Sequence, residues 1–406
     1  MSIPIHHGDF RVPGFRVAAA RSGMRYRDRL DCALLLSDAP ATAAGVFTRN
    51  RFCAAPVALC REHLEASAGT ARAVLINAGI ANACTGEEGV HRARRSARAV
   101  ADRLGVDPTQ VLVASTGVIG PQIRVDTLEA VLPDLAGQLA PGGWENAARA
   151  IMTTDTVPKT AWAQRTIGGK TVTAGGIAKG SGMIAPDMAT MLAFVVTDAA
   201  VSTPVLQVGL RRAADRTFNR ITVDGDTSTN DTVLALASGA AGNAPIQDPH
   251  GPGAHEFFTL LTAVCADLAQ QIVRDGEGAT KFVVVRVQGA RTRDRATQVA
   301  RTVAQSPLVK TALFGQDANW GRVVAAAGRA GVDFDPERVS LRFGQVSVFE
   351  KGRPLEDPTL EARASQVLRQ KDIEMVLDLG EGEEEDTYYT CDFSYDYVKI
   401  NADYRS

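Results

Sequence analysis

Hydrophobic residues in this chain alternate between short continuous runs and runs spaced three or four residues apart. The run 74–79 predicts a buried strand that ends at a glycine, and the apolar residues that follow it have helical spacing: Val90, Ala93, Ala97, Val100 and Leu104. A second short run, 111–114, predicts another strand. It leads directly into Ser115, Thr116 and Gly117.

The same alternation continues to the C-terminus. A second helical pattern is formed by Phe257, Leu261, Val264, Leu268 and Ile272, and the glycines of 275–278 are expected to end it. A strand is predicted to resume over 281–287, while 241–253, with three prolines, is predicted to be a loop. Alternating strands and helices indicate a layered α/β protein. We expect a catalytic α/β core over 1–280 and a smaller C-terminal α/β domain over 281–406 that completes the active site.

Composition narrows the range of functions. The 406 residues include 45% hydrophobic and 22% charged residues, and the net charge is −2, which gives no electrostatic reason to expect nucleic acid or a membrane as partner. No apolar run approaches the roughly 18 to 20 residues that span a bilayer. Six scattered cysteines without a CxxC pair, and an N-terminus without a targeting pattern, predict reduced thiols and a cytoplasmic protein.

Two charged stretches are interpreted as structural. The arginines at 92, 94, 95 and 98 lie on one face of the predicted helix, where a solvated face is the more common arrangement than a basic docking patch. The acidic run 381–386 is expected to be a solvated loop.

The catalytic residues are expected within Lys179–Leu192, where a glycine-rich segment precedes Thr190. If the Ala189–Thr190 bond is cleaved, Thr190 carries both a hydroxyl nucleophile and an α-amine, whose unperturbed pKa of about 7.7 to 8.0 suits a base. The six histidines have no metal-ligand spacing. This disfavours a metal site or a catalytic triad. Thr116 and Gly117 could supply a hydroxyl and a backbone N–H to an oxyanion, although Ser-Thr-Gly is also a common turn.

Nine segments of the chain, in order, carry a resemblance to a known family. They are 40–48, 77–86, 114–120, 152–156, 179–192, 221–231, 275–281, 319–322 and 400–404. With them the chain resembles the glutamate N-acetyltransferase (ornithine acetyltransferase) family of arginine biosynthesis from end to end. The resemblance implies a layered α-β-β-α core of the ornithine acetyltransferase and DmpA-like type.

The resemblance also implies an activity. Cleavage between Ala189 and Thr190 would leave fragments 1–189 and 190–406, associated as a heterotetramer of two α and two β chains. Thr190 would take acetyl from N2-acetylornithine and pass it to glutamate in a ping-pong reaction, with Thr116 and Gly117 as the oxyanion hole. No cofactor is implied, and acetyl-CoA is a possible second donor.

Six residues match positions that contact the amino-acid substrate in this family: Thr156, Lys179, Thr190, Glu277, Asn401 and Ser406. Lys179 can pair with an α-carboxylate and Glu277 with the ornithine δ-ammonium. Thr153 or Thr154 could take the place of Thr156. Lys179 could instead be a surface charge, and Glu277 a helix-end residue.

Two other functions remain open at this stage. One is an aminopeptidase or amidase with the same self-processing nucleophile, in which water takes the acyl group. The other is a non-catalytic α/β protein that holds an anion at the glycine-rich loop near Lys179.

Overall fold

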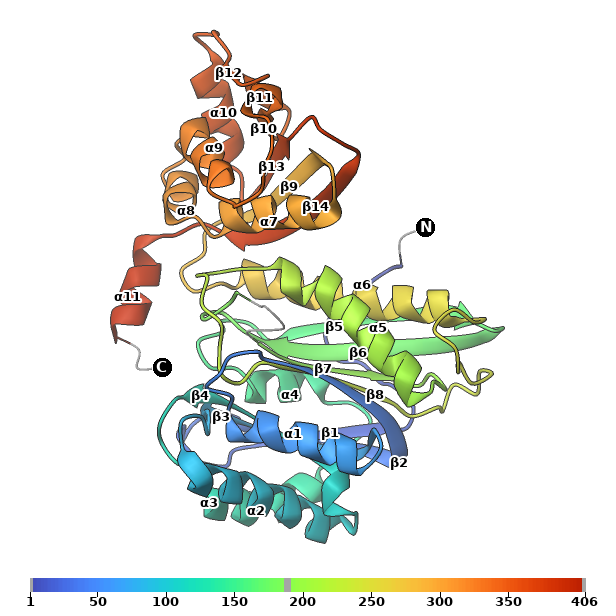
Figure 1. Ribbon diagram of the computed structural model, residues 1–406. Coiled ribbons are helices and arrows are strands. Elements are labelled where there is room, and N and C mark those ends of the chain that lie inside the picture. Colours follow the sequence, from blue (N-terminus) through green and yellow to red (C-terminus); the bar gives the residue numbers. More distant parts are fainter. Residues whose placement is uncertain (1–2, 186–190, 404–406) are drawn as a thin grey trace. The chain divides into compact units, whose positions relative to one another are not determined.

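The structure, a computed structural model, describes residues 3–185 and 191–403. The chain forms two compact units, one of residues 1–219 and 226–272 with residue 406, the other of 220–225 and 273–405. Each unit has its own sheet and is described separately. The layered α/β class predicted from the sequence is confirmed (Figure 1).

The first unit is built on one sheet with the strand order β4-β3-β2-β8-β7-β6-β5, and β1 pairs with β2. Its strands are β1 (Phe15–Ala20), β2 (Cys32–Phe47), β3 (Thr70–Ile80), β4 (Val111–Val118), β5 (Lys159–Ile167), β6 (Lys170–Lys179), β7 (Leu192–Thr197) and β8 (Thr232–Ala237). Its helices are α1 (Ala55–Ala66), α2 (Gly86–Leu104), α3 (Val125–Gly137), α4 (Trp144–Ala150), α5 (Thr203–Arg216) and α6 (Ala254–Arg274).

The long strand β2 joins the two halves of this sheet. Its alternate side chains point to opposite faces, so that Leu35 enters a core shared with β7 and β8, whereas Leu34 packs toward α2 and α3. Trp144 of α4 joins the shared core and stacks on Phe10 at a ring distance of 4.8 Å. The result is two β layers with helices outside each of them, which is the predicted α-β-β-α core.

Helix α6 belongs to the outer layer beside β6. It is long and apolar enough, by length and composition, to cross a membrane, so the expectation that no stretch reaches that limit is wrong. Its apolar residues are buried in the fold instead. A Cβ on Gly176 of β6 would lie 3.1 Å from Leu268, and one on Gly209 of α5 would lie 2.7 Å from Phe258. These glycines let α6 pack closely against a strand and a helix.

The second unit has the strand order β12-β11-β10-β13-β9-β14. Its strands are β9 (Phe282–Ala290), β10 (Ser340–Phe343), β11 (Val346–Glu350), β12 (Arg353–Pro354), β13 (Asp372–Asp378) and β14 (Glu384–Cys391). Its helices are α7 (Arg293–Ala304), α8 (Pro307–Phe314), α9 (Trp320–Gly328), α10 (Leu360–Leu368) and α11 (Tyr395–Asp403). Val283, Val285 and Val287 face the helices, while Arg286 on the opposite face pairs with Glu374 at 3.1 Å. Helices therefore cover one face of this sheet.

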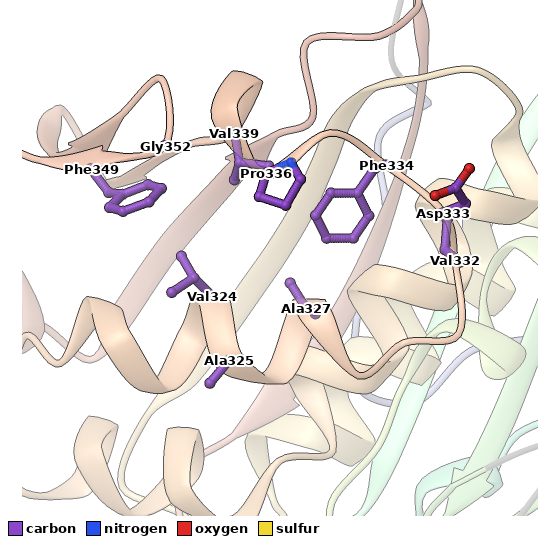
Figure 2. A pocket seen from close by; sticks show the side chains of 11 residues that line it. Val324, Ala325, Ala327, Val332, Asp333, Phe334, Pro336, Val339, Phe349 and Gly352 are labelled. Atoms are coloured by element: carbon purple, nitrogen blue, oxygen red, sulfur yellow. The ribbon is translucent and has the colours of Figure 1, made fainter.

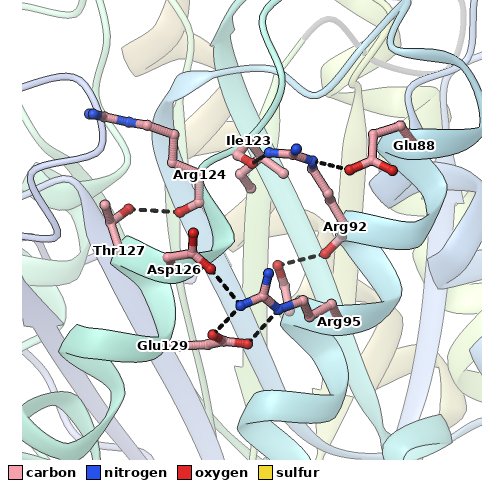
Figure 3. A network of polar contacts seen from close by, with 9 residues as sticks. Glu88, Arg92, Arg95, Ile123, Arg124, Asp126, Thr127 and Glu129 are labelled. Atoms are coloured by element: carbon pink, nitrogen blue, oxygen red, sulfur yellow. Dashed lines mark hydrogen bonds and ion pairs between the residues drawn. The ribbon is translucent and has the colours of Figure 1, made fainter.

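The basic face of α2 is balanced by neighbouring acids (Figure 3). Arg95 contacts Asp126 and Glu129 of α3, and Arg92 pairs with Glu88 at 2.6 Å. These pairs are largely solvent-exposed, in agreement with the predicted solvated face. They also neutralise the charge that a basic docking patch would need.

The acidic run 381–386 is not a solvated loop throughout, so that prediction is wrong at both ends. The Glu381 side chain is buried and pairs with Arg291 at 3.1 Å. Asp386, buried in β14, pairs with Arg220 at 2.7 Å and with Arg293 at 3.1 Å. Both carboxylates pair with arginines that are distant in the sequence.

Candidate active site

Thr116 and Gly117 lie near the C-terminal end of β4, which pairs in parallel with β3. Gly117 lies opposite Gly79 and has a φ of +127°, a conformation that favours glycine. A Cβ at this position would lie 2.3 Å from the carbonyl carbon of Gly79. The pair of glycines therefore brings two backbones together beside the Thr116 hydroxyl.

Lys179 ends β6, and its side chain is directed at Thr116. Its Nζ donates hydrogen bonds to Thr116 Oγ1 at 3.3 Å and to Thr153 Oγ1 at 2.9 Å. Lys179 is 8% exposed, so the reading of it as a surface charge is wrong. Among the three threonines that sequence could not separate, Thr153 contacts Lys179 and Thr156 is exposed.

The contact from Lys179 has a consequence for Thr116. A threonine hydroxyl carries one proton and two acceptor lone pairs. Because the ammonium group is a donor only, Thr116 Oγ1 accepts from Lys179, and its own proton can be donated elsewhere. The geometry suits a hydroxyl that donates to an oxyanion next to a positive charge.

Asp155 organises the cations of this site. Its carboxylate accepts hydrogen bonds from Lys159 Nζ at 2.7 Å, from the N–H of Gly180 at 2.7 Å and from the N–H of Thr153 at 3.0 Å. Lys179 Nζ lies 3.9 Å away. Burial alone would raise the pKa of Asp155, but the ammonium groups of Lys159 and Lys179 hold it well below its usual range. Asp155 is thus an anion that fixes Lys179 next to Thr116.

We predict that Asp155→Asn lowers the free energy of unfolding by about 3 to 5 kcal/mol, because it removes the buried carboxylate that two ammonium groups face. Urea unfolding at neutral pH measures the change. The lowered pKa stabilises the fold above about pH 4, the unfolded value, and this stability is lost as pH falls through the folded value. The acid-dependent part should be absent from the variant.

A surface pair offers the matched control for this prediction. Asp102 on α2 lies 4.0 Å from Arg98, and both side chains are mostly exposed. Asp102→Asn should leave the unfolding curve unchanged, since exposed pairs contribute little. Equal stability of Asp155→Asn and the native protein would contradict the organising role of Asp155.

Asn230 braces the strand that carries Thr116. Its Nδ2 donates to the carbonyl oxygens of Ser115 at 2.8 Å and Ala81 at 2.6 Å. Ser115 is also held through its hydroxyl, which donates to Asn77 Oδ1 at 2.6 Å. These buried bonds fix the peptide that precedes Thr116.

Glu277 and Asn401, predicted as substrate contacts, meet within the second unit. Asn401 Nδ2 donates to Glu277 Oε2 at 2.8 Å across 124 positions of sequence. Glu277 is 7% exposed and follows the end of α6, and Asn401 lies on α11. The amide orients the carboxylate, whose other oxygen can accept a hydrogen bond from an ammonium group.

Three predicted positions, Ala189, Thr190 and Ser406, lie outside the described residues. Within the described ranges, 3–185 and 191–403, no group of three or more histidine, cysteine, aspartate or glutamate residues could hold a metal ion. All six cysteines are free thiols, four of them buried.

A separate cavity of about 380 Å³ lies in the second unit between α9, the segment 332–339 and β11 (Figure 2). Its lining is mostly apolar, including Val324, Phe334 and Phe349, and Asp333 is its one ionisable residue. None of the predicted site residues lines it. The cavity therefore lacks the hydroxyl nucleophile and the cation predicted for the acyl-transfer site.

Similarity to known proteins covers almost the whole chain. The model of the ArgJ family matches residues 16–406. The arginine biosynthesis bifunctional protein ArgJ of Geobacter sulfurreducens is 51% identical over 97% of this chain and 100% of its own. The protein of the same name from Symbiobacterium thermophilum is 53% identical over 93% of this chain and 92% of its own. The crystal structure of the arginine biosynthesis bifunctional protein ArgJ from Bacillus halodurans is 42% identical to this chain, with a TM-score of 0.51. The match covers 53% of this chain and 100% of that chain.

The α-β-β-α fold, the Thr116 hydroxyl beside a buried ammonium group and these relatives together define an acyltransferase. The match to the family model leaves only the first fifteen residues uncovered. The chain belongs to the ArgJ family.

Asp155 and Asn230 were assigned no role from the sequence. Asp155 contacts Gly180, 25 positions away, and Asn230 contacts Ser115 and Ala81, 115 and 149 positions away, which no local pattern reveals. A signal did exist, because both fall within the segments 152–156 and 221–231 that carry the family resemblance. Buried acids in such segments, next to a lysine, are candidates for site residues.

Proposed function

We propose that this protein is a glutamate N-acetyltransferase of arginine biosynthesis, which moves acetyl from N2-acetylornithine to glutamate through an ester on Thr190. The observation that carries the proposal is the contact of Lys179 with Thr116, in a chain of the ArgJ family. It joins a cation and a hydroxyl that were predicted separately for one acyl-transfer site.

Each described residue has a chemical task in this reaction. Thr116 Oγ1 and the Gly117 N–H stabilise the negative charge on the acetyl oxygen in the tetrahedral intermediate. Lys179, fixed by Asp155, adds positive charge beside Thr116 and pairs with a substrate carboxylate. Glu277, oriented by Asn401, accepts the δ-ammonium of ornithine. Thr156 and Ser406 remain candidate substrate contacts.

The α-amine of Thr190 is the general base, and it arises when the Ala189–Thr190 bond is cleaved. Support for cleavage comes from chain length. The Bacillus halodurans chain is matched over its whole length yet covers 53% of this chain, which is about the share of residues 190–406. We expect fragments 1–189 and 190–406 to assemble as a heterotetramer in the cytoplasm.

The names of the relatives contain the word bifunctional. We therefore propose that acetyl-CoA also serves as acetyl donor to glutamate, as a substrate rather than a bound cofactor. Assays with acetyl-CoA and with N2-acetylornithine, each with glutamate, measure both activities.

The competing functions give different products. An amidase with the same nucleophile would release acetate even when glutamate is present, whereas the transferase yields N-acetylglutamate and ornithine. A non-catalytic binding protein would remain one chain on a denaturing gel. Dominant acetate release would overturn the transferase.

We predict that Thr116→Val lowers kcat by about 10²- to 10³-fold while the melting temperature stays close to the native value, since one donor to the oxyanion is lost and the shape is kept. Thr173→Val is the matched control, because Thr173 is also a buried threonine, and its hydroxyl contacts Gln164 in the first unit, not Lys179. Native kcat in Thr116→Val would remove Thr116 from the oxyanion hole.

A further inference from the structure

The loop 21–31 connects β1 to β2, and a buried acid fixes its shape. The carboxylate of Asp31 accepts hydrogen bonds from the N–H groups of Ser22 at 2.5 Å and of Met24 at 3.2 Å. Asp31 is 0% exposed, and the Met24 side chain is also buried. The arginines that follow in this loop are therefore held at defined places.

Two of these arginines contact the candidate active site. Arg25 Nη1 donates to the carbonyl oxygen of Gly79, the partner of the oxyanion-hole glycine, at 3.3 Å. Arg29 Nη1 donates to the carbonyl oxygen of Thr153 at 3.4 Å. The hydroxyl of the same threonine accepts from Lys179 Nζ at 2.9 Å. The loop thus brings guanidinium groups to residues that the site already uses.

Arg29 is the more firmly held of the two. Its Nη2 atom donates to the carbonyl oxygen of Met152, and its guanidinium carbon lies 4.4 Å from the centre of the Tyr26 ring. Neither the carbonyl oxygens nor the ring carries a charge, so these contacts do not neutralise the arginine. Arg29 is partly exposed, and each of its terminal nitrogens has a second N–H that can bind a ligand.

Thr153 sets the spacing of two cations. Its hydroxyl contacts the ammonium group of Lys179, and its carbonyl oxygen contacts the guanidinium group of Arg29. An ammonium and a guanidinium on either side of one residue suit a ligand with two carboxylates, each in a charge-assisted hydrogen bond. The planar guanidinium in particular matches a carboxylate with two parallel bonds.

The two amino acids of the proposed reaction differ in this respect. N2-acetylornithine has one carboxylate and an ammonium group, whereas glutamate has two carboxylates. Lys179 takes one carboxylate of either substrate in the proposed function. The second carboxylate of glutamate needs a cation of its own, because an anion that leaves water without a partner is costly.

We infer that Arg29 binds the γ-carboxylate of glutamate and thereby selects the acetyl acceptor. This inference rests on the proposed function, in which glutamate takes the acetyl group and Lys179 pairs with its α-carboxylate. Arg29 takes no part in bond making or proton transfer. Its guanidinium group offers no attraction to the ammonium group of ornithine, so it discriminates between the two half-reactions.

Steady-state kinetics of the full-length protein test this role. In a ping-pong reaction, kcat/KM for N2-acetylornithine reports formation of the acetyl-enzyme, and kcat/KM for glutamate reports its consumption. Arg29→Gln should lower kcat/KM for glutamate by about 10- to 100-fold, since a hydrogen bond between charged groups is lost. The value for N2-acetylornithine should fall about 10-fold less.

Glutamine as acceptor gives a readout that a purely structural role of Arg29 would not change. It has the shape of glutamate, but a neutral amide replaces the γ-carboxylate. The ratio of kcat/KM for glutamate to that for glutamine should fall at least about 10-fold in Arg29→Gln. An unchanged ratio would refute the contact with the γ-carboxylate.

Arg27→Gln is the matched control, because Arg27 is an exposed arginine of the same loop. It removes the same charge and should keep the native ratio. An equal fall of the ratio in Arg27→Gln would overturn the specific role of Arg29. The same holds if Arg29→Gln lowers kcat/KM for acetyl-CoA and leaves the ratio unchanged, since the guanidinium group would then bind phosphates of the donor.

Two further outcomes have a defined meaning. If Arg29→Gln does not fold, Arg29→Lys takes its place: it keeps the charge but lacks the planar fork, and the ratio should fall at least about 3-fold. An unchanged ratio in Arg29→Lys would then refute the inference. If the native protein makes no N-acetylglutamate from N2-acetylornithine and glutamate, the proposed function itself fails.

Discussion

Replacing Thr190 with alanine is expected to leave one 406-residue chain with no measurable acetyl transfer. The variant lacks the hydroxyl proposed to attack Ala189 and then to carry the acetyl group, so cleavage and transfer should fail together. We expect transfer to fall by at least about 10⁴-fold, as when a catalytic nucleophile is removed. Denaturing electrophoresis and an assay of N-acetylglutamate measure the two effects.

Thr190→Ser is the control for this prediction, since it keeps a hydroxyl and, after cleavage, an α-amine on the same residue. It should be cleaved and should retain partial transfer. N-terminal sequencing of its larger fragment should begin at residue 190. An intact Thr190→Ala chain with native transfer would exclude Thr190 as nucleophile.

The second large effect is expected for Gly117→Ala. The new Cβ would lie 2.3 Å from the Gly79 carbonyl carbon, which is backbone and cannot rotate away, and φ is +127°. Strain and overpacking together should lower the free energy of unfolding by about 2 to 6 kcal/mol. Because the clash displaces the backbone N–H beside Thr116, transfer by the protein that still folds should fall about 100-fold or more.

Gly120→Ala separates the effect of backbone strain from the effect of the clash with Gly79. Gly120 also has a positive φ, +103°, but no atom lies within 4 Å of its added Cβ. This variant should lose about 1 to 3 kcal/mol from strain alone and keep native kcat. Similar loss of kcat in both variants would mean that the close approach of Gly117 to Gly79 has no catalytic importance.

Much of the fold could be predicted because local periodicity reflects burial. The strand over 74–79 and the helices starting near 90 and 257 were all confirmed, within longer elements: β3, α2 and α6. The loop over 241–253 was also confirmed, since three prolines interrupt regular hydrogen bonding. The acidic run failed because arginines from distant segments pair with it.

The site was less accessible to the same reasoning. Glycines after Lys179 suggested a loop, yet pairing with Leu192 makes this lysine the last residue of β6. Its partners come from two other places in the sequence, Thr116 from one and Thr153 and Asp155 from the other. Residue type indicated which chemistry was available, whereas only the fold determines which groups meet.

The strand order of the first unit makes the two proposed fragments mutually dependent. Strands β7 and β8 come from residues after position 190, yet they lie between β2 and β6, which come from residues before it. Strands β7 and β8 of the proposed later fragment are therefore hydrogen-bonded on both sides to strands of the earlier one. Separating the proposed fragments would break the backbone hydrogen bonds of two strand pairs and expose four unpaired strand edges, so dissociation of a cut chain would require the first unit to unfold.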